Sequence, residues 1–129
     1  MAIRPPALQM GDTIGVVTLG SPLPANIINE LLNTVRNMGF NVVLGEHVYD
    51  QNGFLAGTDV ERAADLMRMF ENEDVKLILP TRGGVGVAGI LPYLDFEVIR
   101  RHPKIVTGYS DITVLQNVLT QYVNLITTV

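Results

Sequence analysis

The turn Gly108-Tyr109-Ser110-Asp111 carries the residue types in this chain that are most suited to chemistry. It follows a short apolar segment and precedes an amphipathic one, so we expect Ser110 where a strand feeds directly into a helix. There the serine hydroxyl can act as a nucleophile, with the backbone amide of Asp111 helping to form an oxyanion hole. Serine is also among the best helix N-caps, and Ile112 stands where the usual nucleophile pattern has a second glycine. Local sequence therefore favours the cap over the nucleophile.

The run Gly84-Val85-Gly86-Val87-Ala88-Gly89 matches the glycine pattern of dinucleotide-binding loops and follows an expected strand. That fingerprint belongs at the first strand–helix turn, whereas this run follows the third strand. The next strand ends in Thr107-Gly108 rather than in an acidic residue for the ribose. Dinucleotide binding is therefore disfavoured. The glycines either permit a tight turn or expose successive backbone amides that receive an anion.

A serine nucleophile needs a base, which is normally a histidine held by a carboxylate. The chain has two histidines. His102 precedes the fourth expected strand, at the wrong end of the sheet for partnering Ser110. His47 follows the second strand, at the permissible end, but lies in a polar loop with no marked partner. We expect both histidines to be solvated surface residues.

The apolar segments alternate between the periodicities of strands and helices. Strands are predicted at 13–18, 41–45, 75–80, 104–108 and 123–129, and helices at 24–38, 58–72, 95–101 and 111–122. The run Thr58-Asp59-Val60-Glu61 predicts a capping box at the start of the second helix. The inner face of that helix is expected to contain Ala63, Ala64, Met67 and Phe70.

This alternation, with nearly continuous apolar strands, predicts a doubly wound α/β fold, in which helices cover both faces of a mainly parallel sheet. In such folds ligands bind beyond the carboxyl ends of the strands. The loops at 19–22, 81–86 and 109–111 should converge there. Residues 47–57 form a further long loop, of a length that is often functional.

Composition excludes several classes of protein. The 129 residues suit one domain, and a net charge of -4 with scattered basic residues disfavours nucleic-acid binding. The absence of cysteine removes disulfides, thiolate metal sites and a cysteine nucleophile. No apolar stretch is long enough to span a membrane. We expect a soluble, cytoplasmic protein that uses no metal or cofactor.

Four ordered sequence blocks together are more specific than any single motif. They are Gly53-Phe54-Leu55-Ala56-Gly57-Thr58-Asp59, Glu61-Arg62-Ala63-Ala64-Asp65-Leu66, Arg82-Gly83-Gly84-Val85-Gly86 and Gly108-Tyr109-Ser110-Asp111, and the opening Arg4-Pro5-Pro6-Ala7-Leu8 with Gly11-Asp12-Thr13-Ile14 adds to them. In these blocks the chain closely resembles the LD-carboxypeptidase family of serine peptidases. That family also includes proteins that confer immunity to peptide–nucleotide microcins.

The resemblance implies an N-terminal α/β domain of the flavodoxin-like or class I glutamine amidotransferase-like kind, joined to a smaller C-terminal domain. It implies cleavage of the bond between an L- and a D-amino acid in murein tetrapeptides. It assigns the nucleophile to Ser110 and the oxyanion-hole amides to Gly84 and Asp111. Val85 replaces an aromatic residue that is common in the family's glycine loop.

The family's triad glutamate and histidine lie well beyond residue 129. We therefore expect residues 1–129 to be the N-terminal, nucleophile-bearing domain, with the C-terminal domain absent from this chain and little activity in this part alone. Two alternatives remain, a microcin-immunity peptidase and a non-catalytic module that binds an anion or nucleotide. The expected partners are a murein peptide, the missing domain and, through an exposed fifth strand, a second copy of the chain.

Overall fold

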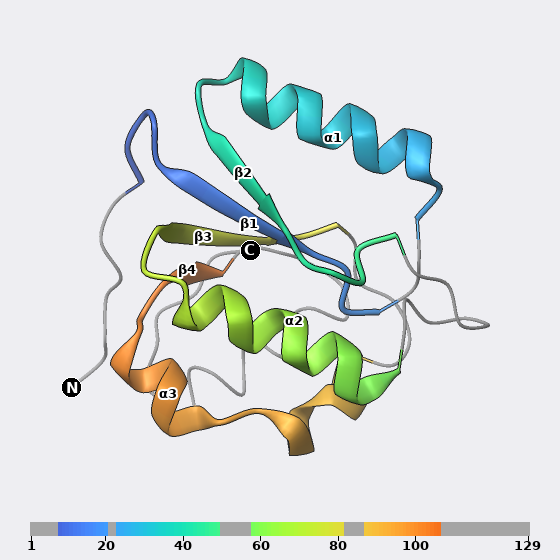
Figure 1. The fold of residues 1–129 in the computed structure, drawn as a ribbon, viewed down its shortest axis with the longest axis vertical. Coiled ribbons are helices and arrows are strands. Elements are labelled where there is room, and N and C mark those ends of the chain that lie inside the picture. Colours follow the sequence, from blue (N-terminus) through green and yellow to red (C-terminus); the bar gives the residue numbers. More distant parts are fainter. Residues whose placement is uncertain (1–7, 21–22, 50–57, 82–86, 107–129) are drawn as a thin grey trace.

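A four-stranded, wholly parallel sheet forms the centre of the computed structural model, which describes residues 8–20, 23–49, 58–81 and 87–106 (Figure 1). The strand order is β2-β1-β3-β4. The strands are β1 (Thr13–Val17), β2 (Asn41–Leu44), β3 (Val75–Pro80) and β4 (Ile105–Val106). The helices are α1 (Ala25–Asn37), α2 (Asp59–Glu71), the 3₁₀ helix η1 (Val87–Tyr93) and α3 (Phe96–Arg101).

Helix α1 lies on one side of the sheet, and α2 and α3 lie on the other (Figure 1). The doubly wound α/β fold predicted from the sequence is therefore confirmed. The strand at 75–80 has the predicted bounds. The first two strands and α3 differ from prediction by one residue at one end, and α1 and α2 by one residue at each end. The helix expected at 111–122 and the strand expected at 123–129 lie outside the described residues.

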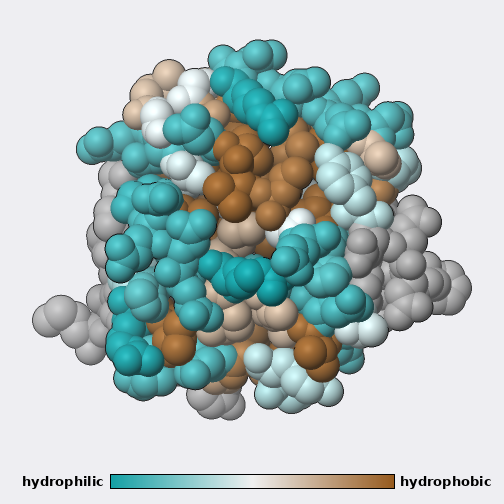
Figure 2. All heavy atoms as spheres, viewed as in Figure 1, coloured by the Kyte–Doolittle hydropathy of each residue, from teal (hydrophilic) through white to brown (hydrophobic). Residues whose placement is uncertain are grey.

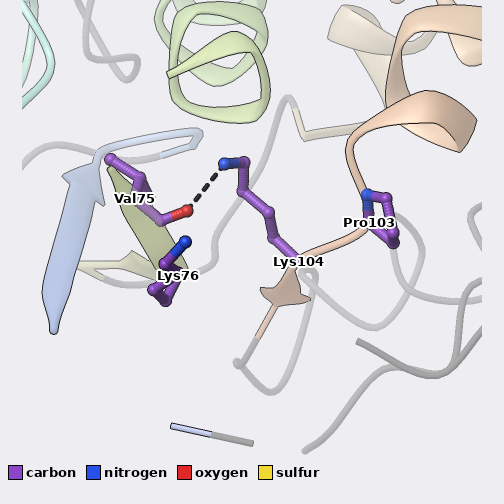
Figure 3. Close-up of a pocket in the computed structure, with 4 residues that line it drawn as sticks. All are labelled: Val75, Lys76, Pro103 and Lys104. Atoms are coloured by element: carbon purple, nitrogen blue, oxygen red, sulfur yellow. Dashed lines mark hydrogen bonds between the residues drawn. The ribbon is translucent and has the colours of Figure 1, made fainter. Parts of the chain in front are cut away.

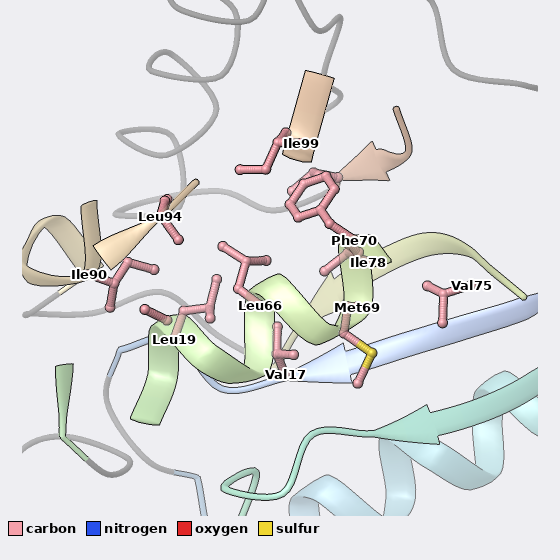
Figure 4. Close-up of a cluster of buried hydrophobic side chains, with 12 residues drawn as sticks. Val17, Leu19, Leu66, Met69, Phe70, Val75, Ile78, Ile90, Leu94 and Ile99 are labelled. Atoms are coloured by element: carbon pink, nitrogen blue, oxygen red, sulfur yellow. The ribbon is translucent and has the colours of Figure 1, made fainter. Parts of the chain in front are cut away.

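The two faces of the sheet build two hydrophobic cores. On the side of α2, side chains from β1 and β3 pack with the helix and with residues of η1 and α3 (Figure 4); the cluster includes Val17, Ile78, Leu66, Phe70, Ile90 and Ile99. On the other side, Ile14 and Val16 of β1 pack against Ile28, Leu32 and Val35 of α1. Alternate residues of β1 thus serve opposite cores, as the period of a strand requires.

The predicted inner face of α2 is only partly right. Ala63 and Phe70 are buried, whereas Ala64 and Met67 are partly buried and Leu66 and Met69 are buried in their place. Leu66 and Met69 follow Ala63 at helical spacing, so they share its face of the helix.

The second core reaches the surface beside β2, which is one of the two edge strands of the described sheet. Figure 2 shows hydrophobic side chains gathered between α1 and the sheet, bordered by polar residues. No helix in the described ranges combines the length and apolar character needed to cross a bilayer.

Helix α2 begins with the predicted capping box. The Glu61 amide donates to Thr58 Oγ1 over 3.1 Å, and the Thr58 amide donates to Glu61 Oε1 over 2.9 Å. By contrast, α1 begins after Pro24 with no side-chain cap. The reciprocal pair satisfies two amides that the first turn leaves without helical partners, so it fixes where α2 starts.

Replacing Thr58 by alanine should lower the free energy of unfolding by about 1 kcal/mol, because the Glu61 amide loses its acceptor. Chemical denaturation at neutral pH measures this. Thr34→Ala is the matched control, since the Thr34 hydroxyl donates to the Glu30 carbonyl within α1 and caps no helix end. Equal losses in the two variants would show that the capping box contributes nothing.

Candidate functional site

The candidate site lies at the carboxyl edge of the sheet, beside the strand at which the strand order reverses. From β1 the chain passes through α1 to β2 on one side, and then through α2 to β3 on the other side of β1. Ligands of doubly wound folds bind at such a switch point, here between β1 and β3. Val17 pairs with Pro80, and the Thr81 amide donates to the Val17 carbonyl over 2.8 Å. The loops that follow these two strands therefore begin side by side, as predicted.

Two threonine hydroxyls join the loops at this edge. Thr18 Oγ1 donates to the Val48 carbonyl over 3.1 Å and lies 2.8 Å from Thr81 Oγ1. Because the Thr18 proton is used on Val48, Thr81 is the donor in the second bond. Thr18 is fully buried. One buried hydroxyl thus links the chain after β1, β2 and β3, a role that the sequence analysis missed although a threonine directly follows both β1 and β3.

Arg62 is a second buried polar residue at this edge. Its Nη1 donates to the Leu19 carbonyl over 2.6 Å, and its Nη2 pairs with the Asp59 carboxylate. Burial lowers the pKa of Arg62, and the charge of Asp59 raises it in part. Its sequence signal is an arginine on the inner face of an amphipathic helix, next to Ala63 and three residues after an aspartate. From the sequence, Arg62 is recognisable only as part of a block that resembles a family.

The expectation that His47 is a solvated residue without a marked partner is wrong. Only 20% of its side chain is exposed, with Nδ1 lying 3.5 Å from Glu61 Oε2 and Nε2 lying 3.9 Å from Glu46 Oε2. Its backbone amide donates over 2.8 Å to the buried Asp65 carboxylate. The turn after β2 packs on α2, a tertiary contact that the local sequence does not reveal.

His102 lies at the opposite edge of the sheet, as predicted. It ends α3, where its backbone amide donates to the carbonyls of Val98 and Ile99, each over 3.1 Å. Its side chain is partly buried rather than fully solvated. Since it precedes β4, it lies away from the switch point.

Ser110, Gly84 and Asp111 lie outside the described residues. The strand that leads toward Ser110 is described, and it pairs in parallel with β3 through Ile78 and Val106. Its carboxyl end therefore lies at the same edge as those of β1 and β3. The assignments to Ser110, Gly84 and Asp111 stay predictions.

A small pocket lies at the other edge of the sheet, where the strands begin (Figure 3). Its volume is about 70 Å³, whereas ligand sites usually measure about 300–1,000 Å³. Lys104 Nζ donates to the carbonyls of Asn72 over 2.5 Å and Val75 over 2.6 Å, and so ties the end of α2 to the start of β3. We assign this pocket a structural role.

The charge of Lys104 is unfavourable where it lies. Burial, followed by the positive charge of Lys76, lowers the pKa of Lys104 to about 8, and Glu73 and Asp74 offset part of this effect. The neutral amine keeps two N–H groups, enough for both carbonyls. Among the residues described, no group of three or more His, Cys, Asp or Glu side chains could hold a metal ion.

Comparison with known proteins identifies relatives across nearly the whole chain. The family model for the LD-carboxypeptidase N-terminal domain matches residues 14–129. A probable murein peptide carboxypeptidase of Bacillus subtilis is 43% identical over 124 residues, which are 96% of this chain and 39% of the relative. The microcin self-immunity protein MccF of Escherichia coli is 34% identical over 111 residues, 84% of this chain and 32% of the relative.

A solved structure is also similar to this chain. The MccF-like protein from Bacillus anthracis superimposes with a TM-score of 0.93 at 32% sequence identity, over 98% of this chain and 40% of that chain. The chain thus spans no more than about two-fifths of the length of these relatives.

Above about pH 8 the folded protein should gain stability through Lys104. Between pH 8 and 10.5 the unfolded chain binds a proton there that the folded chain has released, so the free energy of unfolding rises with pH. Below that window the gain is lost. Denaturation at about pH 7.5 and about pH 10 should show the rise in the wild type and not in Lys104→Met.

Lys76→Met is the control for this experiment. It should keep most of the rise, because burial is the larger cause of the lowered Lys104 pKa. An equal pH dependence in the wild type and Lys104→Met would contradict the assignment.

Proposed function

This chain belongs to the LD-carboxypeptidase family, as its N-terminal domain, and on that premise we propose that the full-length protein is a serine peptidase that cleaves the bond between an L- and a D-amino acid in murein peptides. The family match over residues 14–129 carries the proposal. The murein peptide as substrate is supported by the 43% identical relative from B. subtilis. The switch point between β1 and β3 supplies a suitable place for the reaction.

In this proposal the Ser110 hydroxyl attacks the scissile carbonyl carbon. The backbone amides of Gly84 and Asp111 donate to the oxygen as it becomes negatively charged. Loss of one such donor typically costs about 3–4 kcal/mol of transition-state stabilisation. Gly84 follows β3 in the chain and Ser110 follows β4, two strands that lie side by side and end at the same edge.

The proposal assigns the base and its carboxylate to the C-terminal domain. Of the two histidines, His102 lies at the opposite edge of the sheet. His47 follows β2, and three strand positions separate β2 from β4. At a spacing of about 4.8 Å per strand, this places the two strand ends about 14 Å apart, far beyond a hydrogen bond. His47 also already faces Glu61.

A second candidate function is cleavage of a microcin-type peptide–nucleotide. The observations that favour it are the similarity to the self-immunity protein MccF and the close superposition on an MccF-like structure. Both candidates use the same nucleophile and oxyanion hole and differ in substrate. Comparing kcat/KM for a murein tetrapeptide and for a peptide–nucleotide decides between them.

Ser110→Ala in the full-length protein should lower the release of D-alanine from a murein tetrapeptide by about 10,000-fold or more, because the attacking oxygen is removed. Amino-acid analysis of the products measures this. Thr34→Ala, which removes an exposed hydroxyl on α1, should react at the wild-type rate. Wild-type turnover by Ser110→Ala would refute the assignment of the nucleophile.

Residues 1–129 produced alone should release no D-alanine, since without a base the serine hydroxyl stays protonated. Adding the separate C-terminal domain should restore turnover if the two parts associate. Turnover by residues 1–129 alone would place the base within them.

Calorimetric titration of the same polypeptide with a murein tetrapeptide and with a nucleotide tests the remaining alternative. Binding of the nucleotide but not of the tetrapeptide would favour a non-catalytic module.

A further inference from the structure

Thr18, Arg62 and Asp59 lie at the carboxyl edge of the sheet. They contact the residues that come before and after the glycine segment 82–86 in the sequence. From them we propose that Arg62, together with Asp59, is a positioning residue for the peptidase reaction, because Arg62 binds the chain after β1 and holds the Asp59 carboxylate against Gly89 of η1. This inference rests on the proposed function and adds to it two residues that touch neither the substrate nor the reacting atoms.

Arg62 joins two segments that are far apart in the sequence. Its side chain is fully buried, while 42% of the Asp59 side chain is exposed. One nitrogen of the guanidinium donates to the carbonyl of Leu19, two residues after β1, and the other pairs with Asp59 at the first turn of α2. The planar fork of arginine gives both contacts a fixed geometry, which a lysine cannot reproduce.

Asp59 in turn lies against the backbone of η1. A Cβ placed on Gly89 would come within 2.8 Å of Asp59 Oδ2 and 3.0 Å of its Cγ. Such distances are too short for carbon, so only glycine lets the carboxylate approach this closely. Gly89 belongs to η1, which follows the glycine segment directly in the chain.

The chain before the glycine segment is held as well. Thr81 donates its hydroxyl proton to buried Thr18, and its backbone amide bonds to the Val17 carbonyl. Gly84 lies three residues after Thr81 and three before Val87. Thr81, before this stretch, is thus bonded to the end of β1, and Gly89, after it, packs against the Asp59 carboxylate that Arg62 holds.

Stability alone does not account for Arg62. Burying a guanidinium costs free energy, and replacing a buried ion pair with apolar residues is often neutral or stabilising. Arg62 lies on the inner face of α2 beside Ala63 and Leu66, where an apolar side chain would suit the surrounding core. Its contacts instead hold the Leu19 backbone and the Asp59 carboxylate in fixed positions, and oxyanion-hole donors depend on positioning of this kind.

The test uses the full-length protein with Arg62→Met, Arg62→Lys and Gly89→Ala, and with Arg68→Met as the matched control. Arg68 pairs with Asp65 at the same spacing on the same helix, but 46% of its side chain is exposed and it does not contact Leu19 or Asp59 in the described structure. The measurements are kcat and KM for a murein tetrapeptide, the rate at which a fluorophosphonate labels Ser110, and the melting temperature. Assays are run well below the lowest melting temperature.

Arg62→Met should lower kcat and the labelling rate by about 10- to 100-fold, with a smaller change in KM, because the reacting groups are displaced rather than removed. Arg62→Lys should recover part of the loss, and Gly89→Ala should reproduce it by displacing Asp59. Arg68→Met should match the wild type. A role in stability alone would lower the melting temperature and leave kcat and the labelling rate unchanged.

Wild-type kcat in a folded Arg62→Met protein would overturn the inference. If Arg62→Met does not fold, Gly89→Ala and Asp59→Asn decide, and wild-type kcat in both would overturn it equally. Failure of the proposed function looks different, because the wild type itself would then neither release D-alanine nor react with the fluorophosphonate. That result would remove both proposals.

Discussion

The parallel pairing of β1 with β3 is the constraint on which the rest of the molecule depends. In the sequence β2 lies between β1 and β3, but in the sheet it lies on the other side of β1. The order in which strands are added to the sheet therefore reverses at β1. The reversal sends α1 to one face and α2 to the other, and alternate residues of β1 enter the two cores. It also brings the first residues after β1 and β3 together, where the Thr81 amide bonds to the Val17 carbonyl.

Different polar side chains bind the backbone at the two edges of the sheet. At the carboxyl edge, Thr18 and Arg62 are buried and bind backbone carbonyls of the loops, Val48 and Leu19 respectively. At the amino edge, Lys104 binds the carbonyls of Asn72 and Val75. In each case a polar side chain donates to backbone carbonyls near the ends of strands or helices, and buried backbone groups generally require partners.

Sequence patterns predicted those features that depend on neighbouring residues. The strand Val75–Pro80 was found because six mostly apolar residues lie between a polar turn and the glycine segment. The capping box was found because its four residues are contiguous. By contrast, η1 was missed, since a 3₁₀ helix with Pro92 inside it shows no helical periodicity.

The roles of Thr18, Arg62 and His47 depend on tertiary contacts, and periodicity carries no information about them. His47 faces Glu61 because the turn after β2 packs on α2, and Arg62 meets Leu19 across 43 residues of sequence. The family resemblance supplied what local sequence could not, namely the preference for Ser110 as a nucleophile over a helix cap. The geometry around Ser110, Gly84 and Asp111 lies outside the described residues, so those roles rest on sequence and family.

The hydroxyl pair at the switch point also bears on the order in which the chain acquires its structure. Thr18 and Thr81 are 63 residues apart, whereas β1, α1 and β2 are consecutive in sequence. Closing a long loop costs more entropy than closing a short one, and distant pairings slow folding. We therefore expect the Thr18–Thr81 contact to form after the local β1–α1–β2 unit, and during synthesis it can form only once β3 has left the ribosome.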